Sequence, residues 1–230
     1  MITITFNEEF RTFPKNYVAK FDNDKVVLVG DNATGKSTLM LIIVSKLFMD
    51  IGFKSVFLDN ALGKYMYAIK KNEITVETDK ETLPVIRDEE DFNNFSLVQN
   101  EQGGIPSIVR YLNASIQSSG EKKLEEVLDN IDIQKRGYAD YKAKDGLLLL
   151  LDEPDANLSL ASLLKLRKEL ETVDKYFIIY HNPYMISKEK EVYYLRLGEN
   201  QMACKLRKIS GETYIKEQEK LFEGGFNETK

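Results

Sequence analysis

A glycine-rich run between positions 30 and 38 has the residue types and the spacing that bind phosphate. It fits the pattern G-x-x-x-x-G-K-[ST] with Gly30, Asp31, Asn32, Ala33, Thr34, Gly35, Lys36, Ser37 and Thr38. In such a loop the backbone N–H groups point at phosphate oxygens, while Lys36 would reach the β- and γ-phosphates and Ser37 would ligate Mg²⁺. The apolar residues 26–29 before the loop predict a strand, and the mostly apolar residues 38–49 after it predict a helix. This context favours a phosphate-binding loop over an ordinary glycine turn.

A second candidate site follows five consecutive leucines, at positions 147–151, which predict a buried strand. Asp152 and Glu153 come next, at the carboxyl end of that strand, where α/β sheets bind ligands. Asp152 would hold Mg²⁺ directly or through water, and Glu153 would polarise an attacking water. The alternative is that the two acids and Pro154 merely start a helix. Both roles are compatible.

The chain has one histidine, His181, which follows a predicted strand at Tyr176–Tyr180. A lone histidine is usually a surface or packing residue. At the end of a core strand, however, a neutral imidazole could contact a γ-phosphate.

Residues Ser118, Ser119, Gly120, Glu121 and Lys122 stand at the head of a predicted helix over 121–131. Leucine, valine and isoleucine residues give this helix one apolar stripe, at positions 124, 127, 128 and 131. Taken alone, the Ser118-x-x-Glu121 spacing is that of a helix capping box, and this structural role would be preferred over a functional one.

Composition and charge narrow the possible classes of function further. The net charge is −5, so the chain lacks the overall positive charge that indicates nucleic-acid binding. Charge alone does not exclude such binding. A single cysteine, Cys204, excludes a disulfide framework within the chain and a cysteine-rich metal site. No apolar stretch has the length of a membrane span, and the start lacks the pattern of a signal peptide, so we expect a cytoplasmic protein without membrane insertion.

Alternating strands and helices around the loop predict an α/β fold. Alternation and apolar runs predict further strands and two helices. The strands are Ile2–Phe6, Tyr17–Phe21, Lys25–Val29, Ser55–Leu58, Tyr65–Ile69 and Glu73–Thr78, and the helices lie at 105–117 and near Leu160–Leu170. Residues 84–95 are acidic and Asn-rich and predict a surface loop. The end predicts a hairpin of Val192–Leu197 with Met202–Ile209, followed by a short helix or tail over Glu212–Phe222.

Taken in order along the chain, these motifs resemble those of the ABC-type ATPase family. The glycine-rich loop has the form G-x-N-x-x-G-K-S-T, Ser118–Lys122 resembles the signature motif, and Asp152-Glu153-Pro154 is similar to the Walker B motif with its catalytic glutamate. Asp155-Ala156-Asn157-Leu158 falls at the D-loop and His181 at the switch histidine. The resemblance implies Gln99, with Gln102 as the alternative, as the Q-loop residue near Mg²⁺.

The resemblance implies one ABC-type P-loop NTPase domain over residues 1–230. Its central, mostly parallel sheet would be flanked by helices, an antiparallel β lobe, and a helical signature subregion at about 96–145. Family members stack an aromatic ring on adenine. Phe13 and Tyr17 could serve, although core packing is the preferred interpretation for each.

Departures from the transporter pattern indicate the soluble branch that contains SMC, RecF and OLD-type proteins. Glu121 and Lys122 replace the last two signature residues, and Ser159 stands where the D-loop usually ends in aspartate. The stretch from Lys36 to Ser119 is too short for the long coiled coil of SMC proteins and has no heptad run. We therefore expect a bare ATPase head without a fused effector.

The resemblance implies that two heads face each other and trap two ATP molecules with Mg²⁺. Each nucleotide would lie between one head's P-loop and Ser119 and Gly120 of the other. Lys36, Glu153 and His181 would be the catalytic residues. The head would act as a switch for a separate effector protein, in DNA repair, mobile-element biology or phage defence. The principal alternative is the ATP-binding subunit of a transporter whose membrane protein is a separate chain. A P-loop kinase and a module that binds ATP without cleaving it are the less favoured classes.

Overall fold

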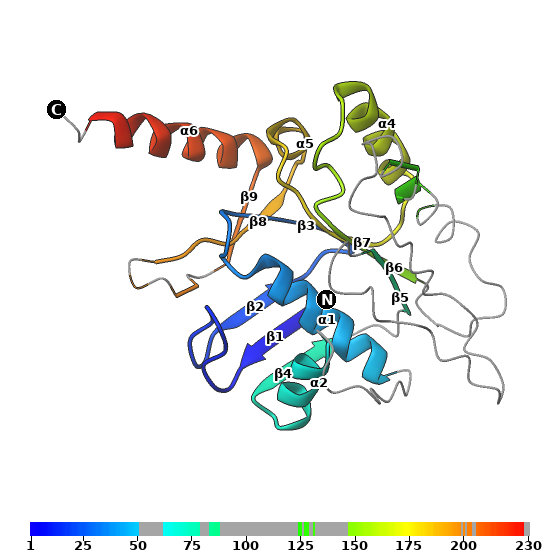
Figure 1. The fold of residues 1–230 in the computed structure, drawn as a ribbon, viewed down its shortest axis with the longest axis vertical. Helices are drawn as coiled ribbons and strands as arrows, with labels where there is room; N and C mark the ends of the chain where they lie inside the picture. The colour runs from blue at the N-terminus through cyan, green and yellow to red at the C-terminus, as the bar shows by residue number, and fades with distance from the viewer. Residues whose placement is uncertain are drawn as a thin grey trace.

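Two β-sheets and the helix between them form the core of the protein (Figure 1). The structure is a computed structural model. It describes residues 1–50, 62–78, 83–87, 124–125, 127–128, 131, 147–198, 200, 202–203 and 206–227.

Among the described residues, the larger sheet has six strands in the order β5-β6-β7-β3-β8-β9. Five of them run parallel, and β9 pairs antiparallel with β8 at one edge. In sheet order the strands are β5 (Leu83–Arg87), β6 (Leu147–Asp152), β7 (Tyr176–Ile179), β3 (Lys25–Val29), β8 (Val192–Tyr194) and β9 (Arg207–Ile209). Continuous apolar runs in β3, β6 and β7 fit strands that are covered on both faces.

The smaller sheet is antiparallel and has the order β2-β1-β4. Its strands are β2 (Val18–Phe21), β1 (Ile2–Phe6) and β4 (Ile74–Thr78). Ile4 pairs with Ala19 on one side and with Val76 on the other, and all three side chains are buried. The antiparallel lobe expected from the sequence is therefore present.

Helix α1 (Lys36–Asp50) lies between the two sheets, and α2 (Gly63–Lys70) packs against it. Eleven of the fifteen residues of α1 are buried, because both of its faces meet a sheet. The opposite face of the larger sheet carries α4 (Leu160–Glu171), α5 (Pro183–Ser187) and α6 (Gly211–Asn227). Leu124, Val127 and Ile131 pack on this same face in helical conformation, which confirms the apolar stripe predicted there.

Two predictions about secondary structure are wrong. Tyr65–Ile69, predicted as a strand, lies within the helix α2. The expected surface loop over 84–95 begins as a strand, because Leu83–Arg87 pairs with β6. The predicted strand Ser55–Leu58, the predicted helix over 105–117, and Cys204 lie outside the described residues.

The closing hairpin is confirmed, whereas α5 was not predicted and α6 is longer than the expected short helix over Glu212–Phe222. β8 and β9 form the closing hairpin, extended by a bridge between Leu197 and Ala203, and α6 follows it. The fold is thus α/β, with a mostly parallel sheet and an antiparallel lobe. In the part of the chain that the structure describes, no helix combines the length and apolar character needed to cross a bilayer.

Candidate active site

Three neighbouring strands bring the predicted site residues to one edge of the larger sheet. β6, β7 and β3 lie side by side and run parallel, so their carboxyl ends share that edge. The glycine-rich loop leaves β3, Asp152 ends β6, and His181 follows β7 by two residues. Ligands bind at this edge in open α/β sheets.

The glycine-rich loop adopts a conformation that requires glycine at two positions. Gly30 has φ 151°, and a Cβ there would lie 2.0 Å from the Leu195 carbonyl oxygen. Gly35 has φ 101°, and its Cβ would lie 2.6 Å from the ring of Phe13. Both glycines allow the backbone to pass where a side chain cannot fit.

The Lys36 ammonium is held inside the loop. Its Nζ donates hydrogen bonds to the carbonyl oxygens of Gly30, at 2.8 Å, and of Asp31, at 2.7 Å. The residue is only 6% exposed, and burial lowers its pKa, while the nearby carboxylates of Glu153, Asp152 and Asp31 oppose that shift. These three carboxylates are therefore close enough to act on the lysine charge.

The outer part of the loop faces solvent. Asp31, Asn32, Ala33 and Ser37 are exposed, whereas Thr34 and Thr38 are buried. A ligand that contacts the loop from outside would meet the exposed backbone and the Ser37 hydroxyl first.

Two contacts to this loop come from residues that sequence reasoning missed. Arg11 Nη1 donates to Thr38 Oγ1 at 3.2 Å, and Thr12 Oγ1 donates to the Thr34 carbonyl oxygen at 3.3 Å. Both donors lie in the turn between β1 and β2, more than 20 positions before their acceptors. No local pattern around Arg11 or Thr12 could have revealed such contacts.

Glu153 and His181 form a pair at the carboxyl edge. His181 Nε2 lies 3.0 Å from Glu153 Oε1, and the side chains are 29% and 48% exposed respectively. The distance is that of an ion-pair contact, without the alignment of a hydrogen bond. Contacts of this kind can tighten when a substrate binds.

The turn that carries Glu153 is strained and firmly held. Glu153 has φ 48°, which costs a non-glycine residue about 1–3 kcal/mol. Its N–H donates to the Ile179 carbonyl oxygen at 3.1 Å, and its own carbonyl accepts from Ala156 N at 3.1 Å. Strain that the surrounding structure maintains is typical of functional sites.

Asp155, two residues further on, is a buried carboxylate that is 1% exposed. Its Oδ2 accepts hydrogen bonds from the backbone N–H groups of His181, at 3.0 Å, and Asn182, at 2.7 Å. Burial raises the pKa of Asp155, and the hydrogen bonds from Asn182, from its own backbone and from His181 oppose the rise. The resemblance noted in the sequence places Asp155 in the D-loop, and no local pattern indicates a role for its side chain.

The residues present suit a magnesium ion that is bound together with phosphate. Ser37 and Asp152 offer the hard oxygen ligands that Mg²⁺ prefers. Among the described residues, no group of three or more acidic, histidine or cysteine side chains could hold a metal. Mg²⁺ usually takes one or two protein ligands and completes its shell with phosphate and water.

Several predicted site residues are not tested by the structure. Gln99, the alternative Gln102, and Ser119 and Gly120 of the signature motif lie outside the described residues. Phe13 and Tyr17 are 0% and 8% exposed and belong to the core. This agrees with core packing, the preferred interpretation of both rings.

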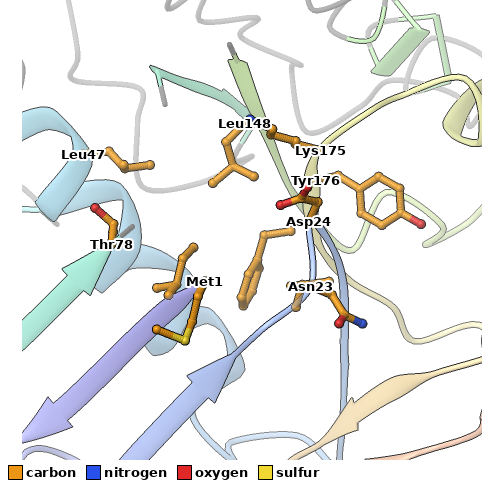
Figure 2. Close-up of a pocket in the computed structure, with 11 residues that line it drawn as sticks. Met1, Asn23, Asp24, Leu47, Thr78, Leu148, Lys175 and Tyr176 are labelled. Atoms are coloured by element: carbon orange, nitrogen blue, oxygen red, sulfur yellow. The ribbon is translucent and has the colours of Figure 1, made fainter. Parts of the chain in front are cut away.

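One pocket lies away from this edge, beside the amino-terminal ends of β3, β6 and β7 (Figure 2). Met1, Asn23, Asp24, Leu148 and Tyr176 are among its lining residues. Because it opens at the opposite edge of the sheet from the glycine-rich loop, it is separate from the candidate site.

Comparison with known proteins identifies the fold. No protein-family model matches the chain, and no curated protein sequence matches it significantly. The structure of an SMC head bound to the C-terminal winged-helix domain of ScpA aligns over 94% of this chain and 98% of its own, with 14% identity and a TM-score of 0.52. A dimeric bacterial ABC transporter cassette aligns over 85% and 94%, with 17% identity and a TM-score of 0.41. A nucleotide-free transporter cassette aligns over 94% of each chain, with 13% identity and a TM-score of 0.42. The chain therefore shares the fold of the SMC head.

Proposed function

We propose that this protein binds and hydrolyses ATP, dimerises around two ATP molecules, and acts as a switch for a separate partner protein. The observation that carries the proposal is the Glu153–His181 pair at the same sheet edge as the Lys36 loop. A phosphate-binding loop alone would suit many nucleotide-binding proteins. A loop with a carboxylate and an imidazole beside it suits hydrolysis by an activated water.

Each residue has a distinct task in the proposed reaction. The backbone of the glycine-rich loop and the amino-terminal end of α1 bind the phosphates. Lys36 exchanges its contacts with the Gly30 and Asp31 carbonyl oxygens for contacts with phosphate oxygens. Glu153 orients the attacking water, and His181 contacts the γ-phosphate. Ser37 and Asp152 would hold Mg²⁺, which would supply the neutralisation of phosphate charge that phosphoryl transfer mainly requires.

Exposure of the site supports dimerisation. The Glu153 side chain is 48% exposed, and Asn32 and Ala33 face solvent. Efficient hydrolysis needs a closed site from which bulk water is excluded. A second copy of the chain, contributing Ser119 and Gly120, would supply that cover. The likeness to an SMC head that binds a domain of another protein supports a separate effector.

Light scattering of the Glu153→Gln variant, with and without Mg-ATP, tests the proposal. We expect the variant to bind ATP and its mass to double with Mg-ATP. We expect its rate of ATP hydrolysis to fall at least about 100-fold, because a catalytic base is lost. Ser119→Arg in the same background is the matched control, because it should block the mass change while it spares ATP binding. Unchanged hydrolysis in Glu153→Gln would disprove the catalytic role, and a mass that ignores ATP would disprove the ATP-dependent dimer.

A further inference from the structure

Asp155 binds the backbone of the segment that carries His181. Its Oδ2 is the acceptor for two consecutive backbone N–H groups, those of His181 and Asn182. A carboxylate that accepts two N–H groups makes charge-assisted hydrogen bonds, which are about twice as strong as neutral ones.

Asn182 continues the anchor into the next element. Its side-chain Oδ1 accepts from Tyr184 N at 2.9 Å and caps the start of α5. His181 therefore stands between a backbone bound to Asp155 and a capped helix, so its backbone has little freedom.

The turn around Asp155 is tied to the same strand on its other side. Glu153 N donates to the Ile179 carbonyl oxygen, two residues before His181. The Glu153 turn and the His181 segment are thus joined by three hydrogen bonds, one from Glu153 and two to Asp155. The Glu153 Oε1 and His181 Nε2 atoms, 3.0 Å apart, lie on the two segments that this junction connects.

The position of Asp155 is unusual for a carboxylate that serves stability alone. Its side chain is buried, and among the described residues its Oδ1 has no hydrogen-bond partner. A buried carboxylate oxygen without a partner costs free energy. A function that needs the charge on Oδ2 accounts for this cost.

We infer that Asp155 is a positioning residue for hydrolysis, which sets His181 opposite Glu153 by binding the backbone of His181 and Asn182. The inference rests on the proposed ATPase function and adds to it a role for a residue that does not touch substrate. The same hydrogen bonds couple the turn over Asp155–Ser159 to His181. A displacement of this turn would therefore displace the imidazole as well.

The test is a double-mutant cycle on hydrolysis, with ATP affinity measured separately. We expect Asp155→Ala to lower kcat about 10- to 100-fold with little change in ATP affinity, because a displacement of about 1 Å has that effect. Asp155→Asn keeps a neutral acceptor for both N–H groups and should fall between wild type and Asp155→Ala. In a His181→Ala background, both substitutions should have no further effect on kcat.

The cycle separates the inference from its premise. If Asp155→Ala lowers kcat equally with and without His181, Asp155 acts through general stability and the inference is wrong. If Glu153→Gln and His181→Ala leave hydrolysis unchanged, the proposed function itself fails, whatever Asp155 does.

Amide hydrogen exchange on the wild-type protein provides a test that does not depend on the folding of any variant. The His181 and Asn182 amides donate to a buried carboxylate, so we expect them to exchange as slowly as the amides of β7. Fast exchange at both positions would overturn the inference, since the anchor would then be open most of the time.

Discussion

Gly30→Ala tests the geometry of the phosphate-binding loop most directly. The new Cβ would lie 2.0 Å from the Leu195 carbonyl oxygen and 3.1 Å from its carbon. The carbonyl cannot turn away freely, because Leu195 N donates to the Val29 carbonyl oxygen at 2.9 Å, next to Gly30. The end of β8 or the start of the loop must therefore move by about 1 Å to restore ordinary contact.

Two costs add at this position. The φ of 151° lies in a region that only glycine adopts readily, and another residue there is destabilised by about 1–3 kcal/mol. Overpacking by the new Cβ destabilises the fold by about 1–3 kcal/mol more. Together they give about 2–6 kcal/mol, or a fall in Tm of about 4–24 °C at 2–4 °C for each kcal/mol. The Gly30 carbonyl oxygen also accepts from Lys36 Nζ, so ATP affinity should fall at least about tenfold for each 1.4 kcal/mol of distortion that reaches the lysine.

Gly211→Ala is a matched control at the start of α6. Its Cβ would lie 1.8 Å from the Ile186 carbonyl oxygen, a similar conflict without the strained φ and outside the site. Overpacking alone should lower its Tm by about 2–12 °C. Thermal unfolding and titration with a fluorescent ATP analogue would be measured for both variants. Equal losses of ATP affinity would refute the reasoning, because the effect would then come from lower stability and not from the loop.

Three further predictions concern other parts of the molecule. Lys36→Ala should abolish ATP binding in the same titration, and retained tight binding would contradict the loop assignment. Asp22, whose pKa is lowered to about 2 mainly by the hydrogen bond from the Tyr193 hydroxyl and then by that from Lys208, stabilises the fold above pH 3.8 and loses this contribution as pH falls through 2. Asp22→Asn should thus lower Tm at pH 7, and its difference from wild type should shrink as pH falls from 3.8 through 2, whereas a constant difference across that range would be inconsistent with the linkage. Ser159→Ala removes the acceptor for Ser162 N at the start of α4 and should cost about 1 kcal/mol without changing ATP affinity, whereas an unchanged Tm would show that the cap contributes nothing.

The positions of the site residues could be predicted because each is marked by a local pattern. Gly30–Thr38 has a fixed spacing, Asp152 and Glu153 follow a run of leucines, and His181 ends an apolar strand. Parallel strands then bring their carboxyl ends to one edge without further information. The motif residues in the described part of the chain lie where this rule places them.

The wrong elements show where local patterns mislead. Aromatic residues at 65 and 67 favour a strand, yet Tyr65, Met66 and Ala68 are buried while Tyr67 is exposed, which is the spacing of a helix face on α1. Pro84 argues against a strand, but β5 is at the edge of the larger sheet, where proline is tolerated. Tertiary position decided both cases.

The contacts of Arg11, Thr12 and Asp155 could not be predicted for a different reason. Each joins segments more than 20 positions apart, through a hydrogen bond that depends on how two turns approach each other. Single-sequence patterns carry no information about such approaches.

The pair formed by Glu153 and His181 contains the only imidazole of the chain, and the chain has no tryptophan. In a preparation purified without a polyhistidine tag, NMR would show one set of imidazole signals, which needs no assignment. Those signals would report the environment of the Glu153–His181 pair when nucleotide is added. A tryptophan introduced at exposed Leu160, which follows the turn that Asp155 anchors, would be an equally unambiguous fluorophore. The composition of this chain therefore makes its proposed active site directly observable in solution.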